Sequence, residues 1–196
     1  MTLQGWYQLA ITSVKDPGQA ARTLMAMGFE AGALWTALVL VAVANTFLFT
    51  LSNVILPGPS PLPEFLSHPW VYFAIVAGGL ALTALSIFGT GRLMGGKGSL
   101  GDILVLIVWM QFLRVLVQAV ALVLMLFLPQ LSGLLVLAVA LIGVYMLVHF
   151  VKEAHRFDTT GRAAFVLVAS FLAIVVGLSV LLTLVGGLTV GSTLNV

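Results

Sequence analysis

Arg114 is the residue whose position most strongly indicates chemistry in this sequence. It lies near the middle of a long apolar run, 103–128, and the sequence places no carboxylate at its depth. A charge at the centre of a bilayer costs about 2.5 to 3.5 kcal/mol on insertion scales and more in simulations. Gln111 and Gln118 stand three residues before it and four residues after it, so the three side chains share one helix face. We expect something polar to meet that face.

Three interpretations of this polar face are open. In the first, Arg114 binds a ligand or lines a pathway for a polar or anionic solute. In the second, which we favour, the guanidinium is satisfied inside the chain by amide side chains and backbone carbonyls. In the third, the face contacts another subunit. The candidate functional polar face in the membrane comprises Asn45, Gln111, Arg114 and Gln118.

A glycine-rich segment, 95–99, invites comparison with a phosphate-binding loop. It reads Gly-Gly-Lys-Gly-Ser, but it lacks the spacing of a nucleotide-binding loop and no strand precedes it. A flexible cytoplasmic turn with one basic anchor is the favoured interpretation. Contact of an anionic lipid with Lys97 and the following helix start is an intermediate alternative.

Other combinations of chemically active residues are weaker. His149, Glu153 and His155 have metal-ligand side chains, but their spacing defines no complete ligand set. We interpret them as part of an interfacial cluster and expect no metal and no cofactor. All six carboxylates sit at or beyond the ends of the apolar runs, which argues against a proton-coupled carrier built on buried acids and against an intramembrane aspartyl protease; they are Asp16, Glu30, Glu64, Asp102, Glu153 and Asp158. We therefore expect that the protein is not an enzyme.

The elements that position these residues must cross a membrane. Of the 196 residues, 61% are hydrophobic and 7% are charged, whereas soluble domains carry roughly 25% charged residues. The net charge of +2 is not organised into a basic stripe, so we expect no nucleic-acid partner. The chain has no cysteine, which excludes disulfides and thiolate metal sites.

The apolar segments predict an all-α, polytopic bundle of five transmembrane helices. About 20 apolar residues cross the hydrocarbon core, and only helices satisfy the backbone there without forming a barrel. Trp70 and Tyr72 suit the aromatic belt at the membrane interface. Ser99 and Asp102 resemble a capping box that starts the third span near Leu100. The predicted spans are 31–56, 70–90, 103–128, 131–151 and 163–188.

The region before the first span, 1–28, is predicted to form short amphipathic cytoplasmic helices. Asp16 and Pro17 have the order of an N-cap and a first helical proline, and Gly28 ends the second helix. These helices lie on the membrane surface or pack on the cytoplasmic ends of the bundle, and the two arrangements are compatible. The five-helix transmembrane domain then covers 29–190, and 191–196 form a short tail.

The distribution of basic residues predicts the orientation. Seven of the eight Lys and Arg residues lie in segments that five antiparallel spans place on one side of the membrane, and the eighth is Arg114 within a span. The positive-inside rule makes that side cytoplasmic, with the N-terminus inside and the C-terminus outside. We expect an integral protein of the plasma membrane, the bacterial inner membrane. The seven residues are candidate cytoplasmic contacts for lipids or partners: Lys15, Arg22, Arg92, Lys97, Lys152, Arg156 and Arg162.

The order of these features resembles the Yip family, the Ypt-interacting-protein membrane proteins, in its bacterial branch. The resemblance is carried by the proline-containing segment 14–22, by the segment 92–99 between the second and third spans, and by the segment 150–162 between the fourth and fifth. It implies the fold and the membrane location and supplies no catalytic residues. Eukaryotic members bear a Tyr-Gly-Pro motif and bind small GTPases. This sequence lacks the motif, so GTPase binding is not carried over.

Together these observations predict a non-enzymatic membrane protein of the Yip type. We expect it to act through protein or lipid contacts as an accessory or organising membrane component. The expected partners are membrane lipids, including anionic headgroups, and another membrane protein or a second copy of the chain. The alternative is a small transporter or channel in which Arg114 lines a polar or anionic pathway. An enzyme acting on lipids is the weakest of the three hypotheses.

Overall fold

The computed structural model describes residues 2–56, 63 and 68–193, and these residues form helices and no strand. Five of the helices, α3 and α5 to α8, are long and apolar enough to cross a membrane, which confirms the predicted all-α fold with five spans. The elements are α1 (Leu3–Lys15), α2 (Pro17–Ala26), α3 (Ala31–Ile55), α5 (Pro69–Leu93), α6 (Leu100–Phe127), α7 (Pro129–His155) and α8 (Thr160–Thr193).

Local signals set the helix starts where the sequence predicts them. The Asp16 carboxylate accepts a hydrogen bond from the Gln19 N–H at 2.9 Å and caps α2. Ser99 and Asp102 form the expected capping box, because each side chain accepts from the other residue's backbone N–H at 3.0 Å. Gly28, just after α2, has the positive φ of 62° that favours glycine. These caps need no tertiary contact, so they were predictable.

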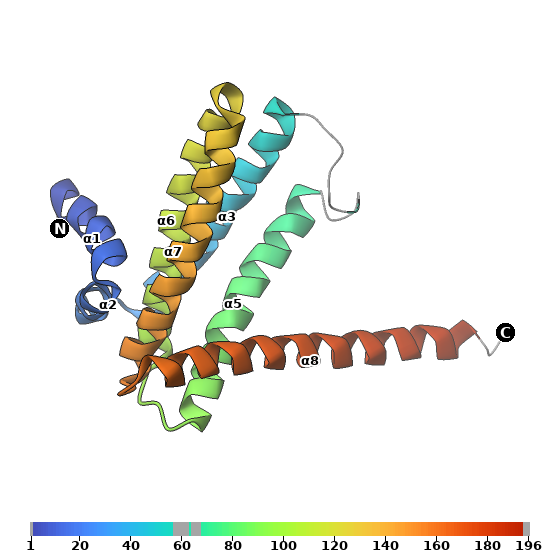
Figure 1. The fold of residues 1–196 in the computed structure, drawn as a ribbon. Helices are drawn as coiled ribbons and strands as arrows, with labels where there is room; N and C mark the ends of the chain where they lie inside the picture. The colour runs from blue at the N-terminus through green and yellow to red at the C-terminus, as the bar shows by residue number, and fades with distance from the viewer. Residues whose placement is uncertain (1, 57–62, 64–67, 194–196) are drawn as a thin grey trace.

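The long helices are arranged as an open bundle (Figure 1). Helix α6 packs against α7 and α3, and α5 packs against α3 and α8. Helix α8 contacts α5 and α7 near its start, and its C-terminal part then extends away from the other helices. Several apolar side chains of α8, such as Phe171 and Val176, are exposed.

The buried apolar core is concentrated at one end of this bundle. We call it the basal end, and it comprises α2, the α5–α6 connection at 94–99 and the α7–α8 connection at 156–159. The first third of α6, from Ile103 to Ile107, is buried on all sides, as is most of the segment from Phe150 to Phe157. The distal half of the bundle contains few buried side chains, among them Asn45, Ala121 and Ser132.

Helices α1 and α2 pack against the basal ends of α6 and α7. The indole N–H of Trp109 donates to the buried Ser13 hydroxyl at 2.8 Å, and the Trp6 ring lies 5.6 Å from the Trp109 ring. On the other side of α1, Leu3 is 88% exposed and Tyr7 is 65% exposed. The structure therefore shows the packed arrangement, and it leaves an apolar face of α1 free for lipid.

Candidate functional site

Three helices meet at a polar network in the distal half of the bundle. Asn45 of α3 is 6% exposed. Its amide N–H donates to the Gln118 carbonyl oxygen of α6 at 3.1 Å, and its own carbonyl oxygen accepts from the Tyr72 hydroxyl of α5 at 3.2 Å. Tyr72 also stacks on Phe49, with ring centroids 3.9 Å apart. Two of the four predicted polar residues, Asn45 and Gln118, are therefore in direct contact.

Tyr72 is a member of this network that sequence reasoning missed. Its place near the start of the second span predicts an interfacial position, with the hydroxyl toward water. Instead the side chain reaches across to Asn45. A tyrosine at the third position of an apolar run can lie at the interface or bond to a neighbouring helix. Only the observed contact with α3 distinguishes these two roles.

Arg114 is exposed and takes no part in the network. Among the residues that the structure describes, its guanidinium forms no hydrogen bond and no ion pair. It lies within electrostatic range of the Tyr72 hydroxyl. The favoured prediction, that Gln111, Gln118 and Asn45 satisfy the guanidinium, is therefore wrong. Gln118 is committed to Asn45, and the side chain of Gln111 makes no hydrogen bond in the described part of the chain.

The depth of Arg114 follows from the length of α6. The helix has 28 residues, and Arg114 is fourteen residues from its first residue and thirteen from its last. At ~1.5 Å per residue, the Cα of Arg114 lies about 20 Å along the helix axis from either end. A side chain that snorkels toward the surface does not comfortably span that distance. The charge therefore belongs to the middle of the apolar segment.

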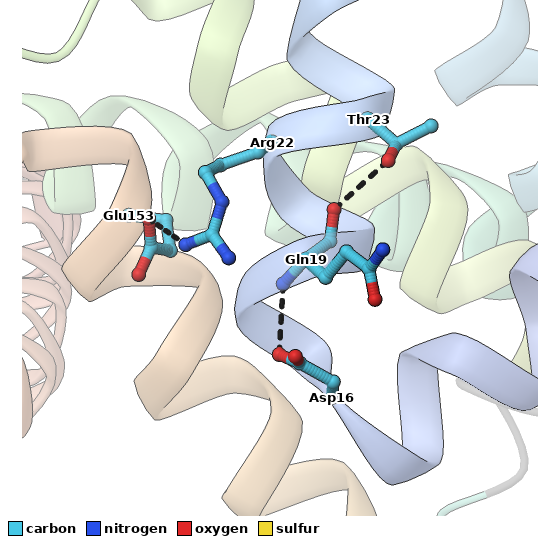
Figure 2. A network of polar contacts seen from close by, with 5 residues as sticks. All are labelled: Asp16, Gln19, Arg22, Thr23 and Glu153. Atoms are coloured by element: carbon cyan, nitrogen blue, oxygen red, sulfur yellow. Dashed lines mark hydrogen bonds and ion pairs between the residues drawn. The ribbon is translucent and has the colours of Figure 1, made fainter.

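The seven other basic residues gather at the basal end, in α1, α2, the two basal connections and the adjoining helix ends. Arg22 pairs with Glu153 at 2.8 Å, as Figure 2 shows, and Arg162 lies 3.8 Å from the exposed Asp158 carboxylate. The remaining five form no ion pair within the described ranges; they are Lys15, Arg92, Lys97, Lys152 and Arg156. The structure thus gathers the predicted contact residues on one side of the molecule.

The glycine-rich connection between α5 and α6 is a packed turn around the His155 ring. The Lys97 N–H donates to the His155 carbonyl at 3.0 Å. A Cβ placed on Gly91 would lie 1.9 Å from His155 Nε2, and one on Gly96 would lie 2.5 Å from His155 Cδ2. Glycine is required at both positions because the imidazole occupies the space of a side chain. This use of the glycines favours neither a phosphate site nor the flexible turn that we expected.

The three residues with metal-ligand side chains point to different partners. His149 Nδ1 lies 2.8 Å from the Tyr145 carbonyl, Glu153 binds Arg22, and the buried His155 ring stacks on Phe157 at 5.3 Å. His155 Nδ1 contacts the Val151 carbonyl at 3.2 Å. Its Nε2 has no partner of ordinary hydrogen-bond geometry within the described ranges, although the Phe88 carbonyl is near. No group of three or more potential ligands occurs in the described residues.

Comparison with known proteins identifies the family. The model of the Yip1 domain matches residues 11–181, which is most of the chain. Neither the curated proteins nor the solved structures include a match. The matched range includes α2, the polar network, Arg114 and the packed glycine turn. The chain therefore belongs to the Yip1 domain family.

Proposed function

We propose that this protein is a non-enzymatic, accessory or organising component of its membrane, and that it acts by binding other membrane components through the Arg114 face. The observation that carries the proposal is the exposed guanidinium in the middle of α6, which has no hydrogen-bond partner among the described residues. Arginine within an apolar span is costly and faces a polar partner or water in most membrane proteins. A contact that supplies acceptors would remove most of that cost.

The rest of the structure supports a binding role over a catalytic one. Asp16 and Asp102 cap helices, and Glu153 is paired with Arg22. Carboxylates in such roles are poor general acids or bases, because their protons and orientation serve the fold. The polar groups of the Arg114 face and of the neighbouring network are amides, a phenol and a guanidinium, which are suited to hydrogen bonding.

The basal end provides a second contact surface in this proposal. Its five unpaired cations face away from the core or lie at its edge, and we assign this end to the cytoplasmic side of the plasma membrane. An exposed Lys or Arg near an anionic leaflet gains about 1 kcal/mol. Lipid headgroups would then hold the basal end at the interface and fix the depth of Arg114.

Photocrosslinking in native membranes tests the proposal. A photoreactive residue at Gln111 would report on the Arg114 face, and one at Leu116 would report on the opposite side of α6, which is also exposed. We expect a discrete adduct from position 111 and diffuse labelling of lipid from position 116. The adduct from position 111 should disappear when Arg114→Leu is added.

Two results would contradict the proposal. One is an identical, purely lipid labelling pattern from both positions. The other is an anion flux through vesicles containing the purified protein that Arg114→Leu abolishes, because it would assign Arg114 to a transport pathway. Val120→Ala, which truncates an exposed side chain on the side of α6 away from Gln111, is the matched control in both assays.

A further inference from the structure

The polar face of α6 has an excess of hydrogen-bond donors. Gln118 uses its carbonyl oxygen to accept from Asn45, and Asn45 uses its carbonyl oxygen to accept from Tyr72. Among the described residues, the groups left over are the N–H groups of the Gln111 and Gln118 amides and the five N–H groups of Arg114. Of the four residues of this face, Gln111 is the one whose carbonyl oxygen accepts no hydrogen bond in the described part of the chain. The complementary group is one that accepts hydrogen bonds, carries negative charge and donates nothing, which describes an ionised carboxylate.

The part of the chain that the structure describes does not supply that carboxylate. Asp16, Glu30, Asp102, Glu153 and Asp158 all lie at the basal end, in connections or terminal turns. The sixth acid, Glu64, falls in the sequence between α3 and α5, outside the described residues.

A second copy of the chain is also a poor source. Two copies inserted in the same direction place Arg114 opposite Arg114 at one depth, which is a repulsive contact. An isologous dimer through this face would therefore increase the electrostatic cost that a partner should remove.

Lipid phosphate is excluded by depth. Arg114 lies about 20 Å along α6 from either end at ~1.5 Å per residue, whereas phosphate groups lie outside a hydrocarbon core about 30 Å thick. The basal cations are well placed for headgroups, but the Arg114 face is not. The acceptor must be able to reside at the centre of the membrane, and an acidic side chain on another transmembrane helix meets that requirement.

We propose that the Arg114 face binds a transmembrane helix of a different protein that carries an Asp or Glu near its midpoint. The carboxylate would bind the guanidinium in a two-pronged contact, and the Gln118 amide would donate beside it. This inference deepens the proposed function and depends on it. It names the chemistry of the partner and excludes self-association as the main use of this face.

A defined peptide probe tests the pairing. Purified protein labelled near its C-terminus is placed in phosphatidylcholine vesicles at mildly alkaline pH with a labelled polyleucine transmembrane peptide bearing one central Glu, and association is followed by energy transfer. We expect this peptide to bind at least about tenfold more tightly than peptides with a central Gln, or with the Glu moved two turns toward one end.

Variants separate the pairing from a general effect on folding. Arg114→Leu should remove the preference for the Glu peptide, and Arg114→Glu should reverse it in favour of a peptide with a central Lys. Val120→Ala, on an exposed part of α6 that faces away from Arg114 and Gln111, should leave the preference unchanged. Thermal unfolding of each variant in detergent shows that it is folded, and Arg114→Lys, which retains the charge but not the planar fork, should keep a reduced preference.

Equal binding of the Glu and Gln peptides would overturn the inference, as would a preference that survives Arg114→Leu. Energy transfer between labelled copies of the protein that depends on Arg114 would overturn it in favour of self-association. If position 111 still gives an Arg114-dependent adduct in native membranes while the peptides show no preference, the proposed function stands and only the acidic helix is wrong.

Discussion

At the basal end of the molecule several polar side chains find partners within the chain, whereas the guanidinium in the middle of α6 finds none among the described residues. Ser13 binds Trp109, Arg22 binds Glu153, and the glycine turn closes on His155. The same chain leaves Arg114 exposed and unpaired among the residues described. The comparison teaches that the basal end holds the fold together, and that the middle of α6 is available for contacts with other molecules.

Burial follows the same division. The basal core contains the long buried runs of α6 and α7 together with α2, where Ala20 and Ala21 are fully buried. The distal half exposes apolar side chains that suit lipid, such as Val120, Val123 and Leu137. Substitutions at the basal end should therefore change stability most, and those around Arg114 should change association with little effect on stability.

The largest expected effect is that of Gly91→Ala. Its Cβ would overlap the His155 ring, and overpacking of this kind costs about 3 kcal/mol or prevents folding. Gly78→Ala is the matched control, because Gly78 lies in the same helix and a Cβ there meets nothing within 4 Å. Thermal unfolding in detergent measures both. Equal melting temperatures of the Gly91→Ala and Gly78→Ala variants would show that the glycine turn does not close on His155. Partial rescue of Gly91→Ala by His155→Ala would identify the His155 ring as the group that the new Cβ meets.

Ser13→Ala should have the next largest effect, a loss of about 2 kcal/mol. The substitution leaves the buried Trp109 N–H without its acceptor, and an unsatisfied buried donor costs about 1 to 3 kcal/mol. Thr23→Ala on α2 is the control, because its exposed hydroxyl bonds only within its own helix. The free energy of unfolding and the Trp fluorescence should change together. A neutral Ser13→Ala with unchanged fluorescence would contradict docking of α1 on α6.

Asn45→Leu should cost about 1 kcal/mol, because interhelical hydrogen bonds in membrane proteins contribute modestly. The change removes the bonds to Gln118 and Tyr72. Thr83→Ala, whose exposed hydroxyl bonds to the Gly79 carbonyl of its own helix, is the control in thermal unfolding. A loss as large as that of Gly91→Ala would show that the distal network stabilises the fold as strongly as the basal end.

Arg22→Ala should cost about 0.5 kcal/mol and should do so mainly at low salt. The pair with Glu153 is solvent-accessible, with 58% of the Arg22 side chain exposed, and exposed pairs are weak and screened. Lys15→Ala, which breaks no ion pair among the described residues, should have no salt-dependent effect. A cost that persists at high salt would assign Arg22 to packing.

Arg114→Leu should leave the stability of the purified monomer unchanged or slightly higher, because the substitution breaks no hydrogen bond in the described structure and removes a costly charge. The same variant should lose the crosslink from position 111. A marked fall in melting temperature would support the interpretation in which the chain satisfies Arg114 internally. The middle of α6 would then contribute to stability, and it would no longer differ from the basal end in this respect.

Much of the fold was predictable because its signals are local. Apolar runs longer than a bilayer requires predict spans, and Asp16 and Ser99 begin helices through bonds to residues three positions away. Seven of the eight basic residues lie in the N-terminal segment and in every second connection between spans. Any antiparallel arrangement of the spans therefore places these seven cations at one end. The predicted span limits lie within a few residues of the observed helices, and the largest difference is at the end of the last helix, which is described to Thr193.

The rotation of each helix about its axis was not predictable. In lipid, an apolar side chain is equally suited to a packed and an unpacked face, so the pattern along α6 does not reveal which side meets α3. The assignment of Arg114 to an internal network with Asn45 failed for this reason, since one face can carry both a satisfied amide and an unsatisfied guanidinium. Tyr72 was missed for the same reason, because the sequence does not reveal that its face of α5 meets α3.

The sequence by itself determined the class, the number of spans, the helix starts and the depth of Arg114, because hydrophobicity and capping act over a few residues or along one helix. The tertiary structure alone decided that Asn45 binds Gln118 and Tyr72, that Gly91 and Gly96 make room for His155, and that Arg114 is left without a partner among the described residues. Those outcomes depend on which helix faces which, and van der Waals packing between helices fixes that after each one is already formed and inserted.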